Sequence, residues 1–167
     1  DIGCRLKILA NLPYSLSNPL LFKLVENRDF VESATLMLQK EVGQRLAAGP
    51  GGKNYGVLSV LASSCAETEV LMPVGPGPFF QKPKVDSVVA QILFHPISDR
   101  VKALPDHDFS LLKKLVNASF QQRRKTLQNS LRSSGISGTA KEDLLEVFAE
   151  SGINAKTRPE QLSVIEF

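Results

Sequence analysis

A short run near the start of the chain, Asn11-Leu12-Pro13-Tyr14, combines groups that could hold and activate an aromatic amine. The side-chain oxygen of Asn11 and the carbonyl oxygen of Leu12 are hydrogen-bond acceptors, and Tyr14 adds a face on which a displaced base could stack. The exocyclic amine of adenine is a poor nucleophile because its lone pair is delocalised into the ring. Two acceptors on its hydrogens favour the pyramidal amine that attacks a methyl group, and they act on charge that develops in the transition state. Pro13 stiffens the turn.

The same residues have a simpler interpretation. An Asn-x-Pro-Tyr sequence after a strand is often only a turn, in which asparagine and proline are selected for backbone shape. A short motif gains weight only when its surroundings agree with it.

Composition and charge limit the number of domains and the kinds of partner. A chain of 167 residues suits one domain, or a domain with a small appendage, and a hydrophobic fraction of 43% predicts a globular core. The formal net charge of +3 permits a polyanionic partner without requiring one. Residues 109–133 hold six basic side chains and no acidic one, whereas residues 142–166 hold six acidic side chains. One segment is therefore basic and its neighbour acidic.

Cys4 and Cys65 lie far apart, in or beside apolar runs and without the spacing of a zinc site or a redox pair, so we expect reduced core thiols. Neither His95 nor His107 belongs to a catalytic or metal-binding motif, and no metal is expected. Because no apolar run approaches the roughly 18 residues of a membrane span, a cytoplasmic protein without membrane attachment is predicted. The chain begins at Asp1, almost directly before a strand, which suggests a piece of a longer protein.

The hydrophobic pattern of the first part predicts an α/β layer. Strands are expected at 6–12, 34–38, 67–74 and 87–94, and helices after an Asn18 cap with Pro19 in the first turn, around 42–46 and within 55–66. The first strand is nearly continuously apolar, which is typical of a parallel strand buried on both faces. The glycine-rich stretch 49–52 predicts a loop.

The second part predicts a small all-helical domain. A polar linker at 95–106 precedes a helix from Phe109 to Phe120 and another that holds 123–131. Thr139 with Glu142, and Thr157 with Glu160, have the spacing of capping boxes. We therefore expect an α/β domain at 1–97 and a helical domain at 98–167.

Two further segments allow both a functional and a structural interpretation. Phe79 in the loop before the last strand could form a second stacking wall opposite Tyr14, with Lys82 and Lys84 facing phosphates, or the Phe79-Phe80 pair could simply plug the sheet edge. The run 121–125, with Arg123, Arg124 and Lys125, could contact phosphates or be a solvated face.

Several separated motifs together resemble the ribosomal-RNA adenine N6,N6-dimethyltransferase family (the KsgA type, with relatives among the erythromycin-resistance methylases). The resemblance rests on 11–14, 37–42, 55–60, Phe79 with 83–87, and 120–127, and it covers nearly the whole chain. It implies the second half of a Rossmann-like methyltransferase sheet followed by a small all-helical domain.

The resemblance also implies roles. Asn11 and the Leu12 carbonyl would hold the target amine, Tyr14 and Phe79 would sandwich the adenine, and Asn11 would border S-adenosylmethionine. The reaction would be successive methyl transfer from that cosubstrate to one adenine amine of 16S-type small-subunit ribosomal RNA during ribosome biogenesis. The helical domain with Arg123, Arg124 and Lys125 would help to dock the RNA.

The chain also departs from the family pattern. The family's glycine-rich cofactor loop belongs to an N-terminal half that this chain lacks, so we expect the chain alone to be catalytically incomplete and to self-associate through an exposed sheet edge. Gln81 replaces a usual proline and Gln128 a usual arginine, which affects local details.

Two rival functions stay open. A DNA adenine methylase also uses Asn-x-Pro-Tyr, although the family's helical domain with Arg-Arg-Lys argues against it. A non-catalytic ribosome-assembly factor would bind pre-ribosomal RNA without methylating it, and the N-terminal sequence would decide between that factor and an enzyme.

Overall fold

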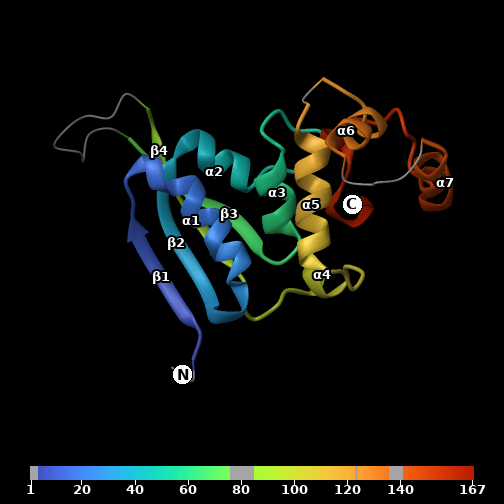
Figure 1. Ribbon diagram of the computed structural model, residues 1–167. Coiled ribbons are helices and arrows are strands. Elements are labelled where there is room, and N and C mark those ends of the chain that lie inside the picture. The colour runs from blue at the N-terminus through green and yellow to red at the C-terminus, as the bar shows by residue number, and fades with distance from the viewer. Residues whose placement is uncertain (1–3, 76–84, 123, 136–140) are drawn as a thin grey trace.

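Four strands form one mixed sheet in a computed structural model that describes residues 4–75, 85–122, 124–135 and 141–167. The strand order is β1 (Leu6–Asn11), β2 (Val31–Gln39), β4 (Ser87–Leu93) and β3 (Glu67–Val74), as Figure 1 shows. β1 runs parallel to β2, whereas β4 is antiparallel to both of its neighbours. The carboxyl ends of β1 and β2 therefore meet the amino end of β4 at one edge of the sheet. The predicted α/β class and all four strands are confirmed.

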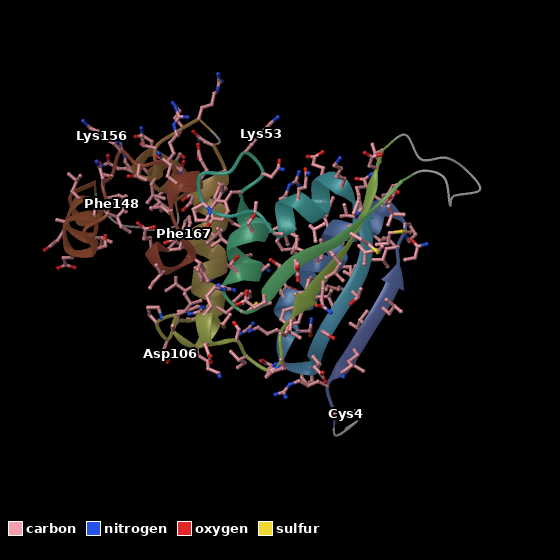
Figure 2. The ribbon with its side chains drawn as sticks, turned by 180° about the vertical axis from the view of Figure 1, so that it is seen from behind. Cys4, Lys53, Asp106, Phe148, Lys156 and Phe167 are labelled. Carbon is pink, nitrogen blue, oxygen red and sulfur yellow. The ribbon has the colours of Figure 1, made fainter. Side chains whose placement is uncertain are left out.

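Three helices cover one face of this sheet: α1 (Tyr14–Glu26), α2 (Lys40–Leu46) and α3 (Val57–Ser63). Alternate residues of β2, such as Leu36 and Leu38, are buried against them. Seen from behind in Figure 2, the opposite face carries no described helix, and Leu9 of β1 is 85% exposed there. The prediction that the first strand is buried on both faces is therefore wrong, because the described helices pack on one face only.

Helix α1 begins five residues earlier than expected, at Tyr14 after a Pro13 cap. Pro19 lies inside the helix rather than in its first turn. The helix tolerates this proline because its inner stripe of Ser17, Leu21, Leu24 and Val25 is buried, while Pro19 and its neighbour Asn18 are exposed. Burial of that stripe outweighs the loss of one backbone hydrogen bond.

Helix α5 (Phe109–Phe120) joins the sheet to the remaining helices. Its Leu112 and Val116 belong to the sheet-side core, whereas its Ala118 belongs to a second buried cluster. That second cluster also contains Leu127 and Leu131 of α6 (Leu127–Ser134), Leu144 and Phe148 of α7 (Lys141–Ser151), and Leu162. At the end of α5, the Phe120 ring meets Tyr55 edge-on at 6.3 Å and stacks on Phe167 at 6.0 Å between ring centroids.

Details of the helical part differ from expectation. The second predicted helix begins at Leu127 with a Thr126 cap, so Arg124 and Lys125 lie in a turn before it. The linker contains a short helix, α4 (Asp99–Lys102). The cap near 157–160 forms one residue later, where the Arg158 N–H donates to Gln161 Oε1 at 2.9 Å before a 3₁₀ turn, η2 (Pro159–Gln161). Thr139 lies outside the described residues. Two further 3₁₀ turns are η1 (Arg28–Phe30) and η3 (Val164–Glu166).

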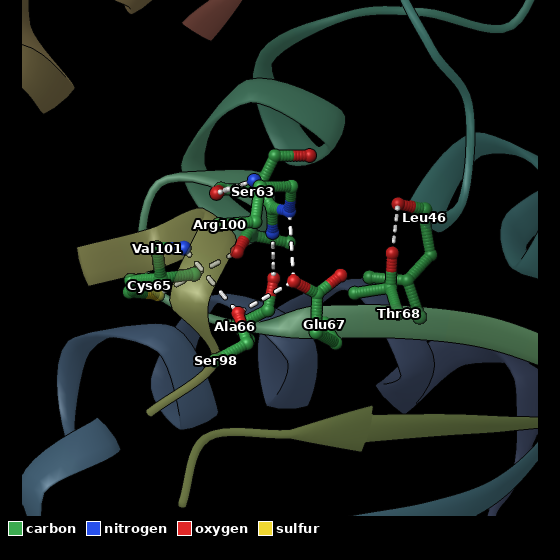
Figure 3. A network of polar contacts seen from close by, with 10 residues as sticks. Leu46, Ser63, Cys65, Ala66, Glu67, Thr68, Ser98, Arg100 and Val101 are labelled. Atoms are coloured by element: carbon green, nitrogen blue, oxygen red, sulfur yellow. Dashed lines mark hydrogen bonds and ion pairs between the residues drawn. The ribbon is translucent and has the colours of Figure 1, made fainter. Parts of the chain in front are cut away.

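A polar network fixes α4 to the start of β3 (Figure 3). The Arg100 guanidinium donates to the carbonyl oxygens of Ser63 (2.8 Å) and Ala66 (2.6 Å) and to Glu67 Oε1 (2.8 Å), which also accepts from Ser98 Oγ (2.6 Å). Partial burial acts to raise the pKa of Glu67, but the hydrogen bonds from Ser98 and Arg100 outweigh it and hold that pKa below its usual value. The Glu67 carboxylate therefore binds protons less readily in the folded state.

This lowered pKa predicts a pH dependence of stability. Because the folded pKa lies below the unfolded one, the stabilisation by Glu67 is complete above about pH 4.5 and is lost as pH falls through the folded pKa. Glu67→Gln should lower the free energy of unfolding by about 0.2–1 kcal/mol at pH 7, since the pair is partly exposed, and by less at pH 3. Urea unfolding at several pH values measures this difference.

The matched control is Glu69→Gln on the same strand, because Glu69 has no ion-pair partner among the described residues. It should change the unfolding free energy little at either pH. A Glu67→Gln effect that is the same at pH 7 and pH 3 would contradict the role of the charge.

Candidate functional site

The sheet edge where β1 and β2 end carries the predicted chemical motif. Asn11 is the last residue of β1, in register with Met37 of β2, and Tyr14 is the first residue of α1. In open α/β sheets, ligands bind outside the carboxyl ends of the strands. The structure thus places Asn11, Leu12, Pro13 and Tyr14 together at the edge where such a site is expected.

Tyr14 is fixed by a contact from far along the sequence. Its hydroxyl lies 2.6 Å from Ser87 Oγ, and Ser87 is the buried first residue of β4. The hydrogen bond joins the start of α1 to the strand that leaves the Phe79-containing loop. The half-buried ring is therefore held at one place on the sheet edge.

Both acceptors that the sequence suggested are available. The Asn11 side chain is exposed and has no hydrogen-bond partner among the described residues. The Leu12 carbonyl likewise accepts no hydrogen bond within the described part of the chain, while the Leu12 side chain packs against the core. Two uncommitted oxygens next to an anchored aromatic ring can accept the two hydrogens of a planar amine.

A cavity of about 410 Å³ lies beside this edge, between α2 and the start of β4. It is lined by Gln39, Lys40, Glu41, Gln44, Val85 and Asp86. The Lys40 N–H donates to the Asp86 carbonyl at 2.9 Å, and Lys40 Nζ lies 3.5 Å from Asp86 Oδ2. Sequence reasoning used both segments only for the resemblance and missed this pairing. The sequence signal for this pairing was that one segment follows the end of β2 and the other precedes the start of β4, and these strand ends lie at the same edge of the sheet.

Several predicted site residues fall outside the described residues. These are Phe79, Lys82, Lys84 and Arg123, together with Phe80 of the pair that could plug the sheet edge.

Arg124 and Lys125 are exposed in the turn between α5 and α6. The Lys125 N–H donates to the Gln122 carbonyl at 3.0 Å, which shapes the turn. Neither side chain has an ion-pair partner among the described residues, so no described contact links them to the acidic segment from Glu142 onward. Unpaired, solvated cations at a turn are suited to contact phosphates.

The described residues also bear on metal binding, thiol reactivity and a membrane span. Across the described residues, no group of His, Cys, Asp and Glu side chains could hold a metal ion. Burial raises the pKa of the Cys65 thiol to about 11, and both cysteines are free, as predicted. The prediction that both lie in the core is wrong for Cys4, which is exposed before the edge strand β1. None of the described helices has the length and apolar character needed to cross a membrane.

Comparison with known proteins gives consistent matches. The family profile described as ribosomal RNA adenine dimethylase matches residues 1–167. The chain is 47% identical over 161 residues to "Ribosomal RNA small subunit methyltransferase A" of Geobacter sulfurreducens, covering 96% of this chain and 56% of the relative. It is 41% identical over 172 residues to the protein of the same name from Desulfotalea psychrophila, covering 99% and 57%. The chain therefore spans somewhat more than half the length of these relatives.

Solved structures share the fold. A dimethyladenosine transferase from Plasmodium falciparum matches 95% of this chain and 62% of its own length, with a TM-score of 0.75 and 24% identity. The 23S rRNA methyltransferase ErmE matches 96% of this chain and 64% of its own, with a TM-score of 0.63 and 19% identity. Both comparisons support the arrangement of sheet and helices.

Proposed function

The chain belongs to the ribosomal RNA adenine dimethylase family, and from this premise we propose that the full-length protein containing it is an S-adenosylmethionine-dependent adenine N6,N6-dimethyltransferase. Its substrate is small-subunit (16S-type) ribosomal RNA in the cytoplasm. One observation carries the proposal: the oxygens of Asn11 and Leu12, which accept no hydrogen bond from any described residue, lie beside the anchored ring of Tyr14. This chain supplies the target-base part of the enzyme.

Each residue of the motif has a distinct task in this proposal. Asn11 Oδ1 and the Leu12 carbonyl accept the two amine hydrogens, which directs the nitrogen lone pair out of the ring plane. Pro13 holds the turn in one conformation, and the Tyr14 ring stacks on the displaced base, with Phe79 proposed as the second wall. The acceptors stabilise the amine most as it becomes positive, so they lower the barrier more than they increase binding.

This chain offers residues for only one side of the cosubstrate site. S-adenosylmethionine supplies an electrophilic methyl group when bound, and Asn11 is the residue of this chain proposed to border it. The exposed, uncommitted Asn11 amide is compatible with that position. We assign the rest of the cofactor site to sequence outside this chain.

The helical residues 98–167 are proposed as the RNA-docking domain that follows the partial methyltransferase domain at 1–97. Arg124 and Lys125, both exposed and unpaired among described residues, support this assignment. Arg123, Lys82 and Lys84 are proposed to add phosphate contacts. The ribosomal small subunit is the proposed partner. Self-association of the isolated chain through the open edge of β1 stays a prediction, which sedimentation at several concentrations would test.

A methyl-transfer assay tests the proposal directly. The full-length protein is incubated with labelled S-adenosylmethionine and unmethylated small-subunit RNA, and the digested nucleosides are separated by mass. We expect N6,N6-dimethyladenosine in RNA and no methylated adenine in duplex DNA. Label in DNA alone would establish a DNA adenine methylase, and RNA binding without any label would establish a non-catalytic assembly factor. The isolated chain should transfer no methyl group.

A further inference from the structure

A second polar cavity lies away from the candidate site, where the sheet side meets the helical part. It has a volume of about 450 Å³, which is within the range of ligand pockets. Its walls come from α2, the loop at 51–55, the end of α5, Gln122 and η2. No role described so far uses this cavity.

The frame of the cavity is tied together by hydrogen bonds. The Gly51 N–H donates to the Glu160 carbonyl at 2.7 Å, joining the glycine-rich loop to η2. Gly51 has a φ of +77°, a backbone conformation that favours glycine. On the opposite wall, Phe120 is held between the rings of Tyr55 and Phe167. The cavity therefore has fixed walls from two parts of the fold.

Among the residues that the structure describes, the charges around the cavity leave the Lys53 cation without a partner. The two lining carboxylates are each paired, Glu41 with Arg45 at 2.8 Å and Glu160 with Arg158 at 3.9 Å. Lys53 is exposed and has no ion-pair partner among the described residues, and Figure 2 shows it projecting from its loop. The backbone N–H groups of Lys53 and Asn54 also lack acceptors within the described part of the chain. These donors are suited to an anion.

The second cavity is connected through α2 to the first cavity, which lies beside the candidate target-base site. Glu41 lines both cavities, and Asn54 Nδ2 in the second donates to Gln44 Oε1 in the first at 3.4 Å. Helix α2 has seven residues, so the two cavities lie within about 10 Å along it. Gln122 also lines the second cavity, and it comes shortly before the exposed Arg124 and Lys125 in the sequence.

We propose that this second cavity binds a nucleotide of the RNA next to the target adenosine, with its phosphate beside Lys53. The inference rests on the proposed function and adds a specific contact to it. A single polynucleotide strand presents phosphates at regular intervals. It can therefore follow α2 from the target-base site to Lys53 and on to the basic turn, which is the turn before α6 that holds Arg124 and Lys125.

Lys53→Gln in the full-length protein tests this contact. The probe is a small-subunit RNA fragment, and its dissociation constant is measured between 50 and 200 mM KCl. We expect weaker binding and a salt slope reduced by about 0.7–0.9, the value for one lost phosphate contact. Lys53→Arg keeps the charge and should restore the slope.

Lys23→Gln is the matched control, because Lys23 is an exposed lysine in the last turn of α1, remote from the Tyr14 end of that helix. It should leave both affinity and slope as in the wild type. Equal slopes for Lys53→Gln and the wild type, or equal reductions in both variants, would overturn the inference. Lower turnover for Lys53→Gln with unchanged RNA binding would overturn it as well. A wild type that binds the RNA but transfers no methyl group contradicts the proposed function, whereas the variant slopes alone decide the phosphate contact.

Discussion

Asn11→Ala in the full-length protein is expected to lower kcat for methyl transfer by about 100- to 1,000-fold while changing RNA affinity little. The magnitude is that of removing one preorganised group that stabilises transition-state charge. Asn11 can have this effect because its side chain is exposed and uncommitted at the end of β1, so its removal disrupts no described hydrogen bond. Single-turnover kinetics with saturating RNA, beside equilibrium binding, separate the two quantities.

Two further variants sharpen this test. Asn11→Asp keeps an acceptor oxygen and should retain more activity than Asn11→Ala. Asn18→Ala removes another exposed asparagine, on the adjacent helix, and should leave kcat unchanged. Equal losses of kcat and RNA affinity in Asn11→Ala would instead identify Asn11 as a binding or structural residue.

Local patterns predicted the elements well where packing and pattern agree. The strand at 67–74 and the helix at 109–120 have their predicted bounds because apolar periodicity and flanking turns agree there. The start of α1 was mispredicted, because a proline is a strong local signal but the buried stripe that begins at Ser17 outweighs it. Exposure of β1 was also mispredicted, since an apolar run reports strand formation and not which faces are covered.

The candidate site also combines features that the sequence predicts with features that only the fold reveals. The position of residues 11–14 at the end of a strand was predictable, because the apolar run before them marks that strand. The hydrogen bond between Tyr14 and Ser87 was not, since it joins positions 73 residues apart and depends on β4 lying between β2 and β3. The basic turn was found by charge alone, yet its placement before α6 required the Thr126 cap.

The Tyr14 ring and its hydroxyl are expected to have separable effects. Tyr14→Ala removes the stacking surface, which is worth about 1–3 kcal/mol, so kcat/KM should fall by about 5- to 150-fold. Tyr14→Phe keeps the ring and loses only the hydrogen bond to Ser87 Oγ, so it should retain most activity. Its main effect should be on stability, a loss of about 0.5–1.5 kcal/mol in the free energy of unfolding.

Ser87→Ala removes the same hydrogen bond from the other side and completes a double-mutant cycle. If the bond serves only to anchor the ring, Tyr14→Phe combined with Ser87→Ala should destabilise the protein by less than the sum of the single changes. Methyl-transfer kinetics and urea unfolding on all four proteins measure both quantities. A Tyr14→Phe variant as slow as Tyr14→Ala, beside a Ser87→Ala variant with wild-type activity, would mean that the hydroxyl acts on the substrate and not through its bond to Ser87. The ring would then not be the main contribution of Tyr14, and the stacking role would be wrong.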